Sequence, residues 1–277
     1  MEDPYLPHNA EVIERIQEGP GIFTLRLRFS EPELHEKYKF APGQFNMLYL
    51  YGVGEVPISI VSDPEDNQLY DHTIRVVGRV TEGLNQLKKG DVLGVRGPYG
   101  RGWPLSKALG KNVVVITGGL GCAPVVAMVH YMIKRRSDYA EISLLQGVKH
   151  SSDLIYQDRL KRYAADANLK FLIAADSASK GWPWYAGRAI DLIPQLNIVP
   201  NKTICFLCGP EMMMITAIKL LIARGMDESN IYLSMERSML CGFGHCGHCQ
   251  FGGKFICKDG PVFCYNEVNA LLGKRGF

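Results

Sequence analysis

Five of the eight cysteines of this 277-residue chain lie within residues 239–268, where glycine is about as common. Cys241, Cys246 and Cys249 follow the pattern C-x4-C-x2-C, and seven residues separate Cys249 from Cys257. Four thiolates in such a loop could hold a [2Fe-2S] cluster or a zinc ion. Structural zinc usually takes two CxxC-type hooks, and only one is present here, so the spacing favours the cluster.

The spacing alone leaves the fourth ligand open. Cys257 and Cys264 are both within reach on the sequence. His245 and His248 lie inside the loop and could ligate as histidines do in Rieske-type centres, but enough cysteines are present that we expect solvated loop residues instead. Three glycines would let the backbone wrap closely and point N–H groups at the sulfurs, which tunes the reduction potential: Gly242, Gly244 and Gly247.

Composition limits the class of protein. With 47% hydrophobic and 21% charged residues, the chain is typical of a folded soluble protein of about two domains. The net charge of +3 gives no reason to expect nucleic acid or an anionic membrane surface as a partner. No apolar run reaches the ~18 residues of a spanning helix, and the acidic start lacks the apolar core of a secretion signal. We therefore expect a cytoplasmic location, where clustered cysteines bind metal more often than they form disulfides.

The pattern of apolar residues divides the chain into three segments. Residues 1–105 contain short alternating stretches between glycine and proline turns, which predicts an antiparallel β-barrel; the clearest stretches are 21–29, 45–52 and 71–80. Residues 106–235 contain continuous apolar runs followed by helical stretches, which predicts a parallel sheet with covering helices. Residues 236–277 are too rich in glycine and cysteine to build a core. The predicted fold class is multidomain, all-β plus α/β, with a small C-terminal cluster-binding segment.

Two strand-to-helix turns in the middle segment have the layout of a dinucleotide site. "VVVITGGLGCAP", residues 113–124, is a buried strand that runs into a glycine turn and an apolar helix, which can seat a pyrophosphate on backbone N–H groups. "CFLCGPEMMM", residues 205–214, repeats this layout. A tight turn without a ligand is the alternative for either motif alone, and we expect the three methionines at 212–214 to pack in the core.

The motifs together resemble the ferredoxin-NADP reductase superfamily over essentially the whole chain. The "GGxGxAP" turn and "CGP" resemble its pyridine-nucleotide domain, and "APGQF" (41–45), "VPISI" (56–60), "IRVVGRVTEGL" (74–84) and "LKKGDVLGVRGPYGRGW" (87–103) resemble its flavin barrel. The tail "CGFGHCGHC…CKDGPVF" resembles the [2Fe-2S] segment of three kinds of subunit. These are the electron-transfer subunits of dihydroorotate dehydrogenase and of anaerobic sulfite reductase, and the gamma subunit of cytoplasmic NiFe hydrogenases.

This resemblance implies a role for each matching residue. Four residues would lie along the FAD, namely Pro57, Ile58, Ser59 and Ile60. A helix N-terminus would meet the FAD pyrophosphate through Gly78, Val80 and Thr81. The NAD(P)H site would be shaped by Gly118, Gly119, Gly121 and Pro124, with Cys208, Gly209 and Pro210 beside the nicotinamide. In the family the cysteine before "DGPVF" is the fourth cluster ligand, which leaves Cys264 as an extra thiol and implies the metal ligands Cys241, Cys246, Cys249 and Cys257.

The chain departs from the usual flavin motif of the superfamily, R-x-Y-S. Val56 replaces the arginine and Ile58 the ring-stacking tyrosine, as in the hydrogenase and sulfite-reductase branch, so we still expect flavin binding. The positive charge for the diphosphate would come from Arg75 or Arg79, because arginine can bind two phosphate oxygens at once. A solvated charge on the barrel surface is the alternative for both arginines.

The implied cofactors form a series. NAD(P)H gives two electrons as a hydride, an iron-sulfur cluster passes one at a time, and FAD does both. We therefore predict no catalytic side chain, because the cofactors carry the chemistry. The expected function is that of an electron-transfer, or diaphorase-type, subunit that passes electrons between NAD(P)H and the catalytic and iron-sulfur subunits of a larger complex. The hydrogenase gamma branch is our first choice, followed by the sulfite reductase subunit and then the dihydroorotate dehydrogenase subunit, whose cluster loop usually has a longer insertion.

The sequence does not decide between NAD and NADP, and it leaves two alternatives to the electron-transfer function. Asp176 would lie near the adenosine ribose and repel a 2′-phosphate, which favours NAD, whereas Lys180 and Arg188 favour NADP. The electron-transfer function also has two alternatives. A zinc-bearing docking module would be colourless, and a redox sensor would show no sustained turnover.

Overall fold

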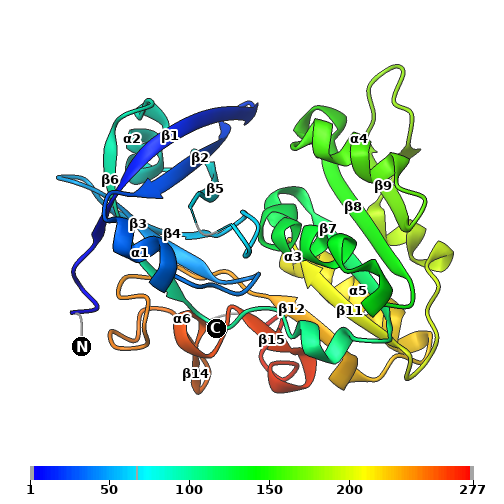
Figure 1. The fold of residues 1–277 in the computed structure, drawn as a ribbon. Helices are drawn as coiled ribbons and strands as arrows, with labels where there is room; N and C mark the ends of the chain where they lie inside the picture. The colour runs from blue at the N-terminus through cyan, green and yellow to red at the C-terminus, as the bar shows by residue number, and fades with distance from the viewer. Residues whose placement is uncertain (1–2, 67, 275–277) are drawn as a thin grey trace. The chain divides into compact units, whose positions relative to one another are not determined.

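By its internal contacts the chain divides into two compact units (Figure 1). The computed structural model describes residues 3–66 and 68–274. The first unit contains Met1–Gly102 and Met235–Pro261, and the second contains Trp103–Ser234 and Val262–Phe277. The cysteine-rich loop thus belongs to the unit that the N-terminal segment forms.

The first unit is built on a six-stranded sheet in the order β4-β3-β6-β1-β2-β5, and every neighbouring pair is antiparallel. This confirms the predicted antiparallel barrel sheet. The strands are β1 (His8–Gly19), β2 (Ile22–Phe29), β3 (Phe45–Leu50), β4 (Gly54–Ser59), β5 (Tyr70–Arg75) and β6 (Val92–Tyr99). Gly21, with φ +64, makes the tight turn between β1 and β2.

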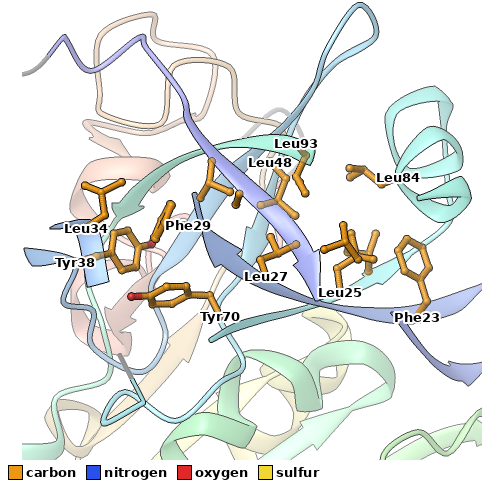
Figure 2. Close-up of a cluster of buried hydrophobic side chains, with 14 residues drawn as sticks. Phe23, Leu25, Leu27, Phe29, Leu34, Tyr38, Leu48, Tyr70, Leu84 and Leu93 are labelled. Atoms are coloured by element: carbon orange, nitrogen blue, oxygen red, sulfur yellow. The ribbon is translucent and has the colours of Figure 1, made fainter. Parts of the chain in front are cut away.

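Alternation along β2 places its apolar side chains in the core of this sheet. Figure 2 shows the cluster, in which Leu25 and Leu27 are fully buried, while Arg26 between them is partly exposed. Two short helices accompany this sheet, α1 (Pro32–Lys37) and α2 (Arg79–Gln86), and Leu84 of α2 packs into the same cluster. Each such side chain stabilises the fold by about 1.5–3 kcal/mol.

The stretch 71–80, which alternation predicts as a strand, is a strand only as far as Arg75. From Arg79 the chain is helical, with Gly78 as the N-cap residue of α2. The Thr81 hydroxyl accepts hydrogen bonds from the N–H groups of Val77 and Gly78, which turns the chain into the helix. Local capping therefore overrides the apparent alternation.

The second unit is built on a seven-stranded sheet in the order β10-β9-β8-β7-β11-β12-β15. All pairs are parallel except β12 with β15. The strands are β7 (Asn112–Gly118), β8 (Ile142–His150), β9 (Leu169–Ser177), β10 (Tyr185–Ala186), β11 (Thr203–Cys208), β12 (Ile231–Ser234) and β15 (Val262–Cys264). The helices are α3 (Ala123–Lys134), α4 (Gln157–Ala165) and α5 (Glu211–Ala223). This confirms the predicted parallel α/β fold.

The order of this sheet creates a switch point between β7 and β11. From β7 the chain runs outward through β8, β9 and β10, and then crosses to β11 on the other side of β7. Every residue of β11 is buried, as a strand covered on both faces requires. In open α/β sheets, ligands bind at the carboxyl ends of the strands at such a switch point.

Short 3-10 turns connect these elements. They are η1 (Leu105–Ala108), η2 (Gly119–Cys122), η3 (Arg136–Asp138), η4 (Ser151–Asp153), η5 (Ala189–Gln195), η6 (Glu228–Asn230) and η7 (Tyr265–Glu267). In the part of the chain that the structure describes, no helix has the length and apolar character needed to cross a bilayer.

Candidate functional site

Residues 235–261, called the cluster loop below, are closed at their base by backbone hydrogen bonds within the first unit. The Met235 N–H donates to the Pro261 carbonyl at 2.8 Å, and the Arg101 N–H donates to the Gly260 carbonyl. The loop contains a two-stranded hairpin and one turn of helix: β13 (Gln250–Phe251), β14 (Lys254–Phe255) and α6 (Ile256–Asp259). Its ends and its hairpin are therefore fixed by hydrogen bonds.

Three of the four predicted cluster ligands are buried in the cluster loop. Cys241, Cys249 and Cys257 are at most 5% exposed, whereas Cys246 lies at the surface. Electrostatic interactions link Cys241 with Cys246, and Cys257 with both Cys249 and Cys241, so the four thiols belong to one group. Among the described residues, no three His, Cys, Asp or Glu side chains are grouped as a single metal ion requires.

Backbone N–H groups of the loop point at these sulfur atoms. The Gly244 N–H donates to Cys257 Sγ at 3.1 Å, and the His245 N–H donates to Cys241 Sγ at 3.3 Å. The N–H of Cys257 itself donates to Cys249 Sγ at 3.4 Å. Such donors stabilise negative charge on sulfur, and the thiolate is the form of cysteine that binds metal. The donor set therefore fits an iron-sulfur cluster held by the four cysteines.

The same surroundings shift the pKa values of two thiols in opposite directions. Burial alone would raise the pKa of Cys241, but hydrogen bonds from the backbone of Cys246, Phe243 and His245 lower it to about 6. Burial raises the pKa of Cys257 to about 12, and the hydrogen bond with Cys249 adds to this effect. Two adjacent buried thiols resist ionising together, and a bound cation would relieve this resistance.

A glycine beside the first ligand allows the loop to press against the barrel sheet. Gly242 has φ +89, and a Cβ atom there would lie 2.7 Å from the ring of Tyr99 on β6. Any larger residue would displace either the loop or the ring. The Phe243 ring also contacts Tyr99, with ring centroids 6.3 Å apart.

The other candidate ligands have different surroundings. The His245 ring is exposed and packs against two aromatic rings of the first unit. His248 Nε2 lies 3.2 Å from the Ser238 hydroxyl. Cys264 belongs to the second unit, on β15, where its thiol donates to two backbone carbonyls at 3.4 and 3.7 Å.

The segment predicted to lie along FAD forms β4 and the residue that follows it. Pro57, Ile58 and Ser59 are half-buried, whereas the side chain of Ile60 is fully covered by protein. Ile60 could therefore contribute only its backbone to a ligand surface in this conformation.

A buried polar network supports this segment. With the ring proton on Nδ1, His72 donates to the Ser59 carbonyl at 3.0 Å, and its Nε2 accepts from the Asn46 amide at 3.2 Å. The Tyr38 hydroxyl donates to the Asn46 side-chain oxygen. Complete burial lowers the pKa of His72 to about 4, so the ring is neutral at physiological pH.

The N-terminus of α2 offers backbone rather than side-chain donors. The Thr81 hydroxyl accepts from Val77 at 2.9 Å and Gly78 at 3.0 Å, and donates to the Gly78 carbonyl at 2.9 Å. The Thr81 hydroxyl is therefore already used in capping the helix. The first N–H groups of a helix lack intrahelical partners, and those of α2 could bind the FAD pyrophosphate.

The remaining residues predicted for the pyrophosphate lie around this helix. The Val80 side chain packs against the barrel core. The Arg79 guanidinium donates to the Val53 carbonyl at 2.8 Å, whereas Arg75 is exposed at the end of β5.

The two turns predicted to bind the nucleotide meet at the switch point of the parallel sheet. A Cβ atom on Gly121 would lie 2.4 Å from the Cys208 carbonyl oxygen, and one on Gly209 would lie 2.8 Å from the Gly118 nitrogen. The turns therefore pack backbone against backbone. At Gly119, with φ +56, a Cβ atom would meet nothing within 4 Å, so space is open there.

The two prolines and three methionines flank these turns. Pro124 lies in the first turn of α3, and Pro210 is the N-cap residue of α5. Met214 is buried, and a Cβ atom on Gly118 would lie 2.5 Å from the Met213 sulfur. The expectation of core packing is wrong for Met212, which is 70% exposed because it lies on the outer face of α5.

The charged residues considered for NAD and NADP have separate surroundings. Asp176 is exposed near the end of β9, and Lys180 is exposed in the loop that follows. Arg188 Nη2 lies 3.1 Å from Asp191 Oδ1 and is therefore engaged in an ion pair.

Two family models match the chain. Residues 115–219 match the oxidoreductase NAD-binding domain, and residues 236–269 match the iron-sulfur cluster binding domain of dihydroorotate dehydrogenase B. Sulfhydrogenase 1 subunit gamma of Pyrococcus furiosus is 38% identical over 98% of this chain and 95% of its own length. The chain belongs to the family of electron-transfer subunits that includes this sulfhydrogenase subunit. A probable dihydroorotate dehydrogenase B electron transfer subunit of the same organism is 34% identical over 87% of each chain.

Solved structures place the electron-transfer subunit in the ferredoxin-NADP reductase fold. An NADH-dependent reduced ferredoxin-NADP oxidoreductase, studied for flavin-based electron bifurcation, superposes with a TM-score of 0.72 at 25% identity, over 99% of this chain and 96% of that one. A ferredoxin NADP+ reductase from Neisseria gonorrhoeae superposes with a TM-score of 0.66 at 20% identity, over 84% and 94%.

These comparisons confirm the predicted family, fold and oxidoreductase class of the electron-transfer subunit. The two family models confirm the expected NAD(P)H and iron-sulfur cofactors at the level of the family, and the reductase from Neisseria gonorrhoeae binds FAD in the same fold. The roles of individual site residues stay predictions.

Sequence reasoning missed several buried polar residues of the electron-transfer subunit. His72 and Asn46 support β4 from within, and Arg96 pairs with Glu55 beneath the cluster loop. The available signal was Arg96 in the otherwise apolar strand β6, since such a group is rarely buried without partners. His72 lies among polar residues of β5, so the sequence did not mark it.

Proposed function

We propose that this chain is the gamma, or diaphorase, subunit of a cytoplasmic NiFe hydrogenase and passes electrons between NAD(P)H and the other subunits of that complex. The observation that carries the proposal is the similarity to sulfhydrogenase 1 subunit gamma, which extends over 98% of this chain at 38% identity. The dihydroorotate dehydrogenase B electron transfer subunits are less similar, at 34% identity over 87% of this chain for that of Pyrococcus furiosus and 32% over 98% for that of Methanocaldococcus jannaschii.

Each unit of the chain has its own part in this function. In the first unit, the thiols of the cluster loop hold the [2Fe-2S] cluster, with the N–H groups of Gly244 and His245 supporting two of them. The backbone of Pro57–Ser59 lines the FAD, with His72 fixing the Ser59 carbonyl. The N-terminus of α2, together with Arg75, holds the FAD pyrophosphate.

In the second unit, the turns at the switch point bind NAD(P)H. Gly119 leaves open space there, while the contact of Gly121 with Cys208 fixes the two turns against each other. Asp176 lies at the carboxyl end of β9, and the sequence predicts it to lie near the adenosine ribose. When bound, FAD exchanges a hydride with the nicotinamide and single electrons with the cluster, and the protein supplies position and electrostatics.

One observation favours a second function, because the family model that matches the cluster loop is that of dihydroorotate dehydrogenase B. The chain could therefore serve as the electron-transfer subunit of that enzyme. The spacing of seven residues before Cys257 favours the hydrogenase branch, since the loop of the alternative is usually longer there.

Anaerobic purification of the tagged chain from its native cells decides between these functions. We expect hydrogenase subunits and nickel to copurify with it. A dihydroorotate dehydrogenase or a sulfite reductase in their place would contradict the hydrogenase assignment and identify the alternative partner.

A further inference from the structure

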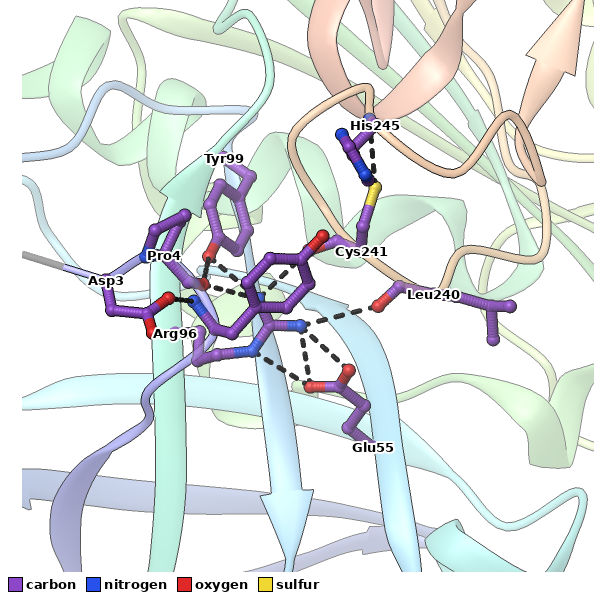
Figure 3. Close-up of polar contacts among 9 residues, drawn as sticks. Asp3, Pro4, Glu55, Arg96, Tyr99, Leu240, Cys241 and His245 are labelled. Atoms are coloured by element: carbon purple, nitrogen blue, oxygen red, sulfur yellow. Dashed lines mark hydrogen bonds and ion pairs between the residues drawn. The ribbon is translucent and has the colours of Figure 1, made fainter.

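Arg96 is a buried cation beside the first predicted cluster ligand. It lies on β6 in the first unit, with 4% of its side chain exposed. Figure 3 shows its guanidinium between Glu55 of β4 and the start of the cluster loop. A buried charge is costly unless it is paired and hydrogen-bonded, so the partners of Arg96 decide whether its position is tolerated.

On one side, Arg96 forms a two-pronged ion pair. Its Nε lies 3.0 Å from Glu55 Oε2, and its Nη2 lies 2.8 Å from Glu55 Oε1. On the other side, Nη1 donates to the Cys241 carbonyl at 3.0 Å, and Nη2 approaches the Leu240 carbonyl at 3.4 Å. Nη1 also donates to the Pro4 carbonyl at 2.8 Å and contacts the Tyr99 hydroxyl at 3.1 Å.

These contacts link the barrel sheet to the peptide that carries a cluster ligand. The carbonyl that Arg96 binds and the thiol predicted to bind iron belong to the same residue, Cys241. The Cys241 thiol in turn accepts from the His245 N–H at 3.3 Å. A planar five-donor guanidinium can hold the carboxylate and the carbonyls together, which a lysine cannot do.

We propose that Arg96 is a positioning residue that holds the Cys241 peptide on β6 and, through its charge, raises the reduction potential of the iron-sulfur cluster, with Glu55 opposing this effect. The inference rests on the proposed function for the presence of the cluster. Reduction adds one negative charge to a cluster, so a nearby cation favours the reduced state and a nearby anion disfavours it. Burial strengthens the effect of Arg96, because its charge acts through a medium of low dielectric constant, whereas Glu55 is 26% exposed and partly screened by water.

The test measures the cluster reduction potential of the full chain by redox titration monitored by electron paramagnetic resonance. Glu55→Gln removes the anion and keeps an oxygen acceptor for Arg96, so the potential should rise. Arg96→Gln removes the cation and leaves Glu55 behind, so the potential should fall. We expect each variant to change the oxidised-to-reduced ratio of the cluster at fixed potential by about tenfold, which is about 59 mV for one electron.

Arg96→Lys separates charge from positioning. It keeps the cation but loses the fork, so its potential should fall less than that of Arg96→Gln. Its cluster loop should nevertheless release iron to a chelator several times faster than the wild type.

The barrel offers a matched control in the ion pair of Arg26 and Asp71. Arg26 Nε lies 2.9 Å from Asp71 Oδ1, and Nη2 lies 3.0 Å from Oδ2, but neither residue bonds to the cluster loop. Arg26→Gln should leave the cluster potential unchanged.

Two results would overturn the inference. Glu55→Gln and Arg96→Gln could shift the potential in the same direction, or Glu55→Gln could shift it no more than Arg26→Gln does. If Arg96→Gln does not fold, the sign observed for Glu55→Gln alone decides. A wild-type chain that holds no iron would instead refute the proposed function, and the inference with it.

Discussion

At the scale of single residues, the cysteines of this chain differ in what their sulfur atoms contact. Cys257 Sγ accepts a backbone hydrogen bond from Gly244 and lies next to Cys249 in the cluster loop. Cys264 donates to carbonyls of Glu228 and Ser229 in the second unit. The spacing of the cysteines could not show which of these two thiols is the fourth cluster ligand, because a loop could bring either one back to Cys249. The contacts support Cys257 as the fourth ligand.

Replacing each of these two cysteines should have opposite consequences for iron content. Cys257→Ser removes a thiolate from the predicted ligand set, so iron should fall from about two per chain to less than one. Cys264→Ser keeps a hydrogen-bond donor for the carbonyls of Glu228 and Ser229 and should leave iron unchanged. Metal analysis of the two anaerobically purified variants, with FAD content as the control for folding, checks this. Loss of iron from Cys264→Ser alone would transfer the ligand role to that residue.

At the scale of elements, the sequence predicted each strand-to-helix turn but not how closely the turns pack. The apolar runs and the glycine motifs indicated that β7 and β11 are buried strands ending in turns. The strand order that makes them neighbours depends on pairings between segments far apart in the sequence, which no local pattern encodes. Alternation also suggested a strand through residue 80, whereas the family resemblance implied a helix N-terminus at Gly78, and the Thr81 hydrogen bonds show why the helix begins there.

Gly119 provides a test of the nucleotide site at this scale. Gly119→Asn retains a residue that tolerates the left-handed backbone, while its side chain enters the open space predicted for the dinucleotide. The dissociation constant for NADH should rise by about tenfold, or about 1.4 kcal/mol, with FAD and iron retained. Titration of NADH into the variant measures this change.

Gly110→Asn is the matched control for that variant. Gly110 also has a left-handed backbone, with φ +69, and a Cβ atom added there would meet nothing within 4 Å, but it precedes β7 rather than following it. Its affinity for NADH should equal that of the wild type. Equal affinity in both variants would remove Gly119 from the nucleotide site.

At the scale of the whole molecule, the two fold classes followed from the sequence because their apolar patterns differ. A sheet with one solvated face alternates, whereas a parallel sheet covered by helices does not. The ion pair of the buried Arg96 with the half-buried Glu55 could not be predicted in this way. The two residues are 41 positions apart, and nothing in the local sequence marks either one as a partner of the other or of the cluster loop.

The central claim, that this chain carries electrons from NAD(P)H through FAD to an iron-sulfur cluster, is tested most directly by one anaerobic titration. The purified chain is titrated with NADH while visible absorbance and electron paramagnetic resonance are recorded. We predict about one FAD and two irons per chain, bleaching of the flavin absorbance, and a paramagnetic signal from the reduced cluster. A colourless protein, or a coloured one whose spectra do not change when NADH or NADPH is added, would contradict the account.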